Sequence, residues 1–310
     1  MMRFKRFCWK KMCIGGRGRN KDCLLYLLLS CKSYYLVKLS CQTTKNLSNV
    51  IYFCVPILFF AFIHLATRYW QDIFIFRPKT LPKNFHFRAN FPLEEITLTA
   101  SEGGKLNGLL LKNETPKGLI LYFHGNAGSL ERWEKIMEEL LPLGWDILIF
   151  DYRGYGKSTG HRNESLMFQD AERMYNWAKK SYLPSNIIIY GRSIGSAMAT
   201  YLASKMQPPK LILETPFLSM SALFHSYYPF IPQIFSFKYA FRSDLYIQKV
   251  NCPILIFHGT EDRVVPYSQG IKLYDLVSNQ AKLITFVGGS HHNCMRYPAF
   301  WAELKLFLAS

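Results

Sequence analysis

The sequence predicts an α/β domain with a mostly parallel, eight-stranded sheet and helices on both faces, preceded by a basic tail and one apolar helix. The chain has 310 residues, of which 49% are hydrophobic and 16% aromatic, so it can bury a large core. This composition excludes a disordered, collagen-like or small disulfide-stapled chain. Beyond about residue 84, short apolar runs alternate with longer amphipathic segments, which is typical of strand–helix units around a parallel sheet.

Positive charge is concentrated at the start of the chain. The formal net charge is +17, and residues 1–48 hold eleven Lys or Arg against the single Asp22. Because this basic tail precedes an apolar segment, we interpret its charge as setting membrane orientation and contacting anionic lipid headgroups. A nucleic-acid surface is the less simple interpretation. We therefore expect no nucleic-acid partner.

The apolar segment covers residues 50–66, which contain no Lys, Arg, Asp or Glu. Seventeen residues are near the lower limit for a membrane span, and Tyr69 and Trp70 behind it suit the interfacial belt. We predict a transmembrane helix over 49–67 and a single-pass protein of an inner or plasma membrane. A buried helix and the apolar part of an export signal are the alternatives, and the side of the membrane that holds the domain stays open.

The following linker is expected over 68–84 and the α/β domain over 85–310. The first two strands are joined by the Gly103-Gly104 turn and form a hairpin, whereas the later ones need helical crossovers. The expected strands are 95–100, 106–112, 118–123, 146–150, 187–190, 211–213, 254–257 and 282–287. The expected helices are 130–141, 165–180, 194–205, 267–278 and 297–308.

A candidate nucleophile lies between the strand 187–190 and the helix that follows it. The segment 191–195 reads GRSIG, with Ser193 at its centre. A serine on a strained strand-to-helix turn needs glycine two positions before and after it, because the backbone there passes close to its neighbours. The start of the helix also offers N–H groups and a positive dipole end to a developing oxyanion.

A serine hydroxyl needs a base to take its proton and a carboxylate to orient that base. In this kind of sheet both are expected after later strands, in the chain order serine, acid, histidine. Asp262 follows the strand 254–257, and His291 and His292 follow the strand 282–287. Glu214, just past the strand 211–213, is a reserve candidate for the acid.

Four segments together resemble the α/β-hydrolase superfamily: 124–128 (HGNAG), 151–156 (DYRGYG), 191–195 and 258–266. In particular they are similar to its membrane-anchored serine hydrolases, a branch that includes protein depalmitoylases and serine-aminopeptidase-like sequences. The resemblance covers roughly residues 85–310 and implies the α/β-hydrolase fold. It assigns the acid to Asp262 and the base to His292, because Asn293 follows His292; His291, where the branch often has a small residue, is the alternative.

An oxyanion hole needs two backbone N–H groups, one from the residue after the nucleophile and one from the loop after the third strand. Ile194 supplies the first. By resemblance Asn126 supplies the second, with Ala127 as a near alternative. His124 and His258 are interpreted as packed structural residues. The turn 151–156 either shapes the site or is a tight loop with solvated charges.

The segment 216–248 lies where the superfamily inserts a cap, and it is dense in aromatic residues. A short aromatic cap would suit an acyl chain or another lipid-like group. The alternative is a helix pair that merely packs on the sheet. The aromatic residues are Phe217, Phe224, Tyr227, Tyr228, Phe230, Phe235, Phe237, Tyr239 and Phe241.

These observations predict a serine hydrolase that cleaves an ester or thioester of an acyl or lipid-like substrate through Ser193, Asp262 and His292. Two alternatives are a serine aminopeptidase-like enzyme, for which no acidic amine-binding group is evident, and a non-catalytic binding protein that kept the fold. No metal-binding or nucleotide-binding motif occurs in the sequence, so we expect no metal and no cofactor.

Overall fold

The computed structural model describes residues 51–52, 54–63, 65, 71–88, 90–230 and 237–310. The chain divides into two compact units, Met1–Leu65 and Ala66–Ser310. The described residues of the first unit are helical and largely exposed. Among the described residues, none of the helices combines the length and apolar character that a membrane crossing requires. The predicted transmembrane segment 49–67 lies partly outside the described residues.

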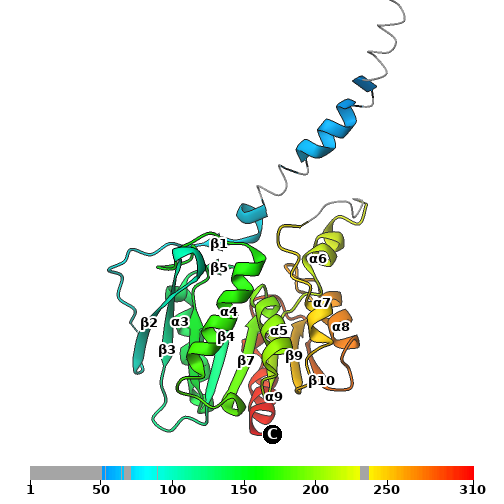
Figure 1. Ribbon diagram of the computed structural model, residues 1–310. Helices are drawn as coiled ribbons and strands as arrows, with labels where there is room; N and C mark the ends of the chain where they lie inside the picture. Colours follow the sequence, from blue (N-terminus) through cyan, green and yellow to red (C-terminus); the bar gives the residue numbers. More distant parts are fainter. Residues whose placement is uncertain (1–50, 53, 64, 66–70, 89, 231–236) are drawn as a thin grey trace, which may run out of the picture. The chain divides into compact units, whose positions relative to one another are not determined.

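The second unit is built on an eight-stranded sheet with helices on both faces (Figure 1). The strand order is β10-β9-β8-β7-β4-β6-β3-β2, and β3 alone runs antiparallel to its neighbours. The strands are β2 (Leu93–Thr99), β3 (Lys105–Leu111), β4 (Leu119–Phe123), β6 (Asp146–Phe150), β7 (Ile187–Arg192), β8 (Leu211–Glu214), β9 (Ile254–Gly259) and β10 (Ala281–Phe286). The prediction of a mostly parallel sheet behind an N-terminal hairpin is confirmed.

From β4 onward, the helices are α3 (Leu130–Leu140), α4 (Glu164–Ala178), α5 (Gly195–Met206), α6 (Met220–Tyr227), α7 (Ser243–Ile247), α8 (Tyr267–Asp275) and α9 (Pro298–Ala309). Five of them, α3, α4, α5, α8 and α9, lie where the amphipathic segments predicted them, and α6 and α7 lie within the segment predicted as a cap. Single 3-10 turns are η1 (Ser101–Gly103), η2 (Leu141–Leu143), η3 (Pro184–Asn186) and η4 (Cys294–Arg296). The predicted boundaries differ by up to three residues, since an apolar pattern marks the buried part of an element and not its last hydrogen bond.

Two apolar layers enclose the sheet because its central strands are buried on both faces. Along β7, Ile187 and Ile189 belong to the cluster under α4, α5, α7 and α8, while Ile188 and Tyr190 belong to the cluster under α3 and α9. Successive side chains of a strand point to opposite faces, so a continuous apolar run serves both layers. This double burial fixes the register of β7 and therefore the position of the turn that follows it.

A second, small sheet lies beside the main one and was not predicted. It pairs β1 (Arg77–Pro78) with β5 (Ala127–Gly128), in parallel. Phe76, just before β1, is buried in the main core. The segment expected to be a linker, 68–84, therefore contributes to the α/β unit. Its two-residue strand was too short for any sequence pattern to show.

Candidate active site

Ser193 stands on a strained turn between β7 and α5. Its φ angle is +52°, in the left-handed region that non-glycine residues rarely adopt. Its N–H donates to the carbonyl of Glu214 at 2.9 Å, and its own carbonyl accepts from the Ser196 N–H, also at 2.9 Å. These bonds hold the turn at the carboxyl end of the sheet, where parallel strands present ligands.

The glycines at both ends of this turn are required by close backbone contacts. A Cβ on Gly191 would lie 2.5 Å from the Cβ of Ala199, and a Cβ on Gly195 would lie 2.1 Å from the carbonyl oxygen of Phe123. No real Cβ tolerates such distances, so only glycine lets α5 start this close to β4 and β7. The spacing in GRSIG thus has the steric origin that the sequence suggested.

His291 connects Ser193 with Asp262. Its Nε2 lies 2.9 Å from Ser193 Oγ, and its Nδ1 lies 2.7 Å from Asp262 Oδ2. The three side chains come from the turns after β7, β9 and β10, all at one edge of the sheet. All three residues are nearly buried. Such a line of hydrogen bonds can carry a proton from the hydroxyl to the ring and hold the resulting imidazolium.

The prediction that His292 occupies this position needs correction. His292 lies at the exposed rim of the cavity, and its ring plane is at 85° to that of His291. Consecutive residues of the turn point in different directions, so only one ring can face Ser193. Asn293, which favoured His292 by resemblance, instead accepts a hydrogen bond from the Ser290 N–H at 2.7 Å and closes the turn.

Asp262 is held as a carboxylate by its neighbours. Burial by itself would raise its pKa, but hydrogen bonds from His258, His291 and the Val265 N–H outweigh burial and lower the pKa below its ordinary value. The Val264 and Val265 N–H groups both donate to Oδ1 at 2.8 Å. Oδ2 thereby faces His291 at 2.7 Å and His258 Nε2 at 3.3 Å.

Glu214, the reserve candidate, is engaged elsewhere. It is fully buried, accepts a hydrogen bond from the Tyr190 hydroxyl at 2.8 Å, and lies 3.3 Å from Arg192 Nε. Arg192 in turn donates to the His291 carbonyl at 3.3 Å. The pair therefore supports the floor of the site and the histidine turn rather than orienting the His291 ring.

Asn126, the predicted oxyanion donor from the loop after β4, lines the same cavity as Ser193. The cavity has a volume of about 670 Å³ and is lined by Gly125, Asn126, Ala127 and Ser193 among others. Ile194 is buried directly behind the serine at the start of α5. Within the described part of the chain, no backbone carbonyl accepts from the N–H of Asn126 or of Ile194. Both donors are thus available to a bound group.

Side chains from two neighbouring segments orient the loop that carries Asn126. His124 Nδ1 lies 2.7 Å from the Gly125 carbonyl, which belongs to the same planar peptide as the Asn126 N–H. Tyr152 and Tyr155, in the turn after β6, donate to the carbonyls of His124 and Asn126, each at 2.7 Å. The turn 151–156 therefore shapes the site, which resolves the choice that the sequence left open.

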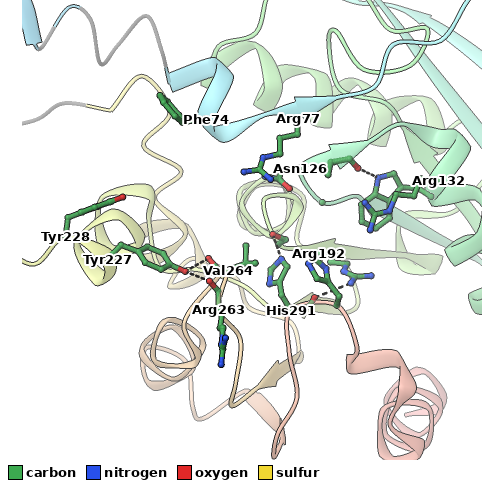
Figure 2. Close-up of a pocket in the computed structure, with 15 residues that line it drawn as sticks. Phe74, Arg77, Asn126, Arg132, Arg192, Tyr227, Tyr228, Arg263, Val264 and His291 are labelled. Atoms are coloured by element: carbon green, nitrogen blue, oxygen red, sulfur yellow. Dashed lines mark hydrogen bonds between the residues drawn. The ribbon is translucent and has the colours of Figure 1, made fainter.

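The aromatic segment between β8 and β9 divides between both of its expected roles. Phe217, Tyr239 and Phe241 are buried in the core. Tyr227 and Tyr228, at the end of α6, line the cavity (Figure 2). The Tyr227 hydroxyl donates to the carbonyls of Arg263 and Val264 and so ties α6 to the loop that carries Asp262.

Sequence reasoning missed the remaining lining residues, which include Phe74, Arg77, Arg132 and Trp133. Phe74 and Arg77 come from the segment taken for a linker, and Arg132 and Trp133 from the first turn of α3. None belongs to a motif. Only the β1–β5 pairing and the packing of α3 bring them to the cavity. Among the described residues, no cluster of His, Cys, Asp or Glu is arranged to hold a metal ion.

Comparison with known proteins identifies the class. The alpha/beta hydrolase fold family matches residues 118–227. The chain is 30% identical to alpha/beta hydrolase domain-containing protein 17C of Xenopus tropicalis, over 69% of this chain and 70% of that protein. The fold is shared with the esterase Pf2001 of Pyrococcus furiosus, with a TM-score of 0.59 and 20% identity over 76% of this chain and 97% of that one. The chain belongs to the α/β-hydrolase family, as the four segments implied.

A further relative has a named lipid substrate. The chain is 35% identical to the lysophosphatidylserine lipase ABHD12 of Danio rerio, over 53% of this chain. The matched region is 48% of the zebrafish protein, so the chain spans about half the length of this relative.

Proposed function

We propose that this chain is a serine hydrolase that cleaves an acyl ester or thioester of a lipid-like substrate. The observation that carries the proposal is the continuous line of hydrogen bonds from Ser193 through His291 to Asp262 at the wall of a cavity. The lipase name of the zebrafish relative supports the choice of a lipid-like substrate.

In this mechanism, Ser193 Oγ attacks the carbonyl carbon while its proton passes to His291 Nε2. Asp262 accepts the Nδ1–H hydrogen bond, which fixes the tautomer and stabilises the imidazolium. The Ile194 and Asn126 N–H groups donate to the oxyanion of the tetrahedral intermediate. His291 returns the proton to the leaving alcohol or thiol. Water then attacks the acyl-enzyme, and His291 takes the proton from water and returns it to Ser193 Oγ as the acyl group leaves.

The lining of the cavity argues against the aminopeptidase alternative. An enzyme that holds a free α-amino group needs a carboxylate to receive it. Among the described residues, no Asp or Glu lines the cavity, whereas four arginines do. The strained φ angle of Ser193 argues against a pure binding protein, because such strain costs of the order of 1–3 kcal/mol and is typical of functional sites.

We also propose that the segment 49–67 anchors the enzyme in a membrane. The uncharged run 50–66 and the basic tail before it support this, as does the lipid-like substrate. The domain organisation that follows is a tail over 1–48, an anchor, and a catalytic domain with its cap over 216–248.

The test of the hydrolase mechanism is labelling with a fluorophosphonate probe, which reacts only with an activated serine. Wild-type protein should label, and Ser193→Ala should not. His291→Ala should lower the labelling rate and kcat by roughly 10⁴-fold or more, as expected when the base of such a unit is lost. His292→Ala, a matched substitution at the next residue, should stay within about tenfold of wild type. Absence of labelling in wild-type protein that is shown to be folded would contradict the mechanism.

A further inference from the structure

The candidate cavity is divided into an aromatic side and a cationic side. Figure 2 shows Phe74, Tyr227 and Tyr228 on one side of His291 and Arg132 and Arg192 on the other, while Arg77 lies above His291 between the two groups. Arg263 also lines the cavity, but its guanidinium points away from His291 in this view. A ligand that fills such a cavity has one apolar end and one anionic end.

Two of the arginines that line the cavity have no compensating charge. Within the described residues, neither Arg77 nor Arg132 forms an ion pair. Lys79 and Glu131, which lie close to the two arginines in sequence, form an ion pair with each other. Arg192, in contrast, is nearly buried and neutralised by Glu214.

Arg77 and Arg132 flank the loop that carries the proposed oxyanion donor. Arg77 pairs with Ala127 across the small sheet, and its N–H donates to the Asn126 carbonyl at 3.0 Å. The Arg132 side chain lies against Gly128, where a Cβ would come within 3.2 Å of its Cδ. The Arg77 backbone and the Arg132 side chain therefore contact opposite ends of the segment 126–128, and both side chains line the cavity beside Ser193.

The positive charge around the cavity affects the pKa of His292, which lies at its rim. The pKa of His292 is lowered by its partial burial and, after that, by neighbouring positive groups that include Arg192 and Arg132. A site that disfavours a further cation favours an anion for the same reason.

We propose that Arg77 and Arg132 form a subsite for a phosphate group on the alcohol part of the substrate. The acyl chain then extends to Phe74, Tyr227 and Tyr228, and the ester carbonyl lies at Ser193 between the two ends. Guanidinium groups suit this task because their planar donors meet phosphate oxygens in pairs. This inference rests on the proposed hydrolase function and adds to it the orientation of the substrate and the residues that select it.

The experiment compares two esters with the same acyl chain, a neutral monoacylglycerol and its glycerol-phosphate counterpart. We expect the wild type to prefer the phosphate ester in kcat/KM. Arg77→Ala and Arg132→Ala should each lower kcat/KM for the phosphate ester by roughly 10- to 100-fold, mainly through KM, and leave the neutral ester within about threefold. Arg296→Ala, which removes an exposed arginine that does not line the cavity, is the matched control and should change neither.

A binding measurement separates this inference from the hydrolase function. Dodecyl phosphate, which has no carbonyl to cleave, should slow fluorophosphonate labelling of wild-type Ser193 far more than dodecanol does, and this difference should disappear in Arg77→Ala with Arg132→Ala. Inorganic phosphate at the same concentration should protect poorly. Equal protection by dodecyl phosphate and dodecanol, or full protection by inorganic phosphate, would overturn the subsite while labelling itself upholds the hydrolase. Absent labelling would overturn the hydrolase.

Discussion

Buried ionisable residues under the oxyanion loop are held in their neutral forms. Burial lowers the pKa of His124 to about 4 and raises the pKa of Asp151 to about 8. His124 Nε2 lies 3.5 Å from Asp151 Oδ1, and the Leu130 N–H donates to both Asp151 oxygens at 3.1 and 3.2 Å. A neutral His124 can keep its Nδ1 proton for the Gly125 carbonyl and so hold the Asn126 N–H in place.

This pair predicts a pH dependence of stability. Between pH 4 and 6.5 the native and unfolded states bind the same number of protons at the two sites, because His124 is neutral and Asp151 protonated only in the native state. Between pH 6.5 and 8 the native state holds one extra proton, on Asp151. The free energy of unfolding should therefore fall by about 2 kcal/mol as pH rises through this interval.

The measurement is urea denaturation of wild type and Asp151→Asn at pH 6.5 and 8. Asparagine keeps an oxygen for the Leu130 N–H but does not titrate, so the fall should be largely removed. Asp275→Asn, at an exposed position, should keep the wild-type slope. If the free energy of unfolding of Asp151→Asn still fell as in wild type between pH 6.5 and 8, other titrating groups would be the cause of the pH dependence.

At the scale of the elements, a buried ion pair joins the turn after β6 to α4. Arg153 donates to both oxygens of Asp170, at 2.6 and 2.9 Å, and both side chains are almost fully buried. The Arg153 guanidinium also donates to the Ser101 carbonyl at 3.1 Å. This pair fixes the start of the turn that carries Tyr152 and Tyr155 under the oxyanion loop.

Breaking the pair from one side should be costly. Arg153→Met leaves the Asp170 carboxylate buried without its partner, which should lower the free energy of unfolding by about 3–5 kcal/mol. Arg242→Met breaks the more exposed pair with Asp244 and should cost less than about 1 kcal/mol. Urea denaturation at neutral pH tests both. Similar losses in the two variants would contradict this account of the buried pair.

At the scale of the whole molecule, charge and apolar character are distributed unevenly along the chain. The tail over 1–48 is strongly basic and is followed by the uncharged run 50–66, while the residues that form the sheet and its helices belong to Ala66–Ser310. This separation favours a membrane-anchoring role for the N-terminal part of the chain and a catalytic role for Ala66–Ser310.

The division predicts how the protein fractionates. The full chain should remain in the membrane pellet after extraction with alkaline carbonate and dissolve only in detergent, because a spanning helix is not held by charge. A chain that starts at Ala66 should move to the soluble fraction and keep fluorophosphonate labelling. Release of the full chain by carbonate would contradict an anchor over 49–67, and loss of labelling in the shortened chain would contradict an independent catalytic unit.

The sequence by itself determined the sheet, its crossovers and the positions of Ser193 and Asp262. Each of these has a local physical cause: double burial gives continuous apolar strands, and the elbow needs glycine two residues either side of the serine. Local pattern also pointed to the turn after the last strand as the source of the histidine.

Only the tertiary structure decided which histidine faces Ser193, because His291 and His292 share one turn and differ only in the direction of their rings. It also decided the character of the cavity. Arg77 reaches it through a two-residue strand and Arg132 through the packing of α3, and neither contact leaves a periodic trace in the sequence. Side chains converge on a site through long-range packing, and that convergence exists only once the chain has folded.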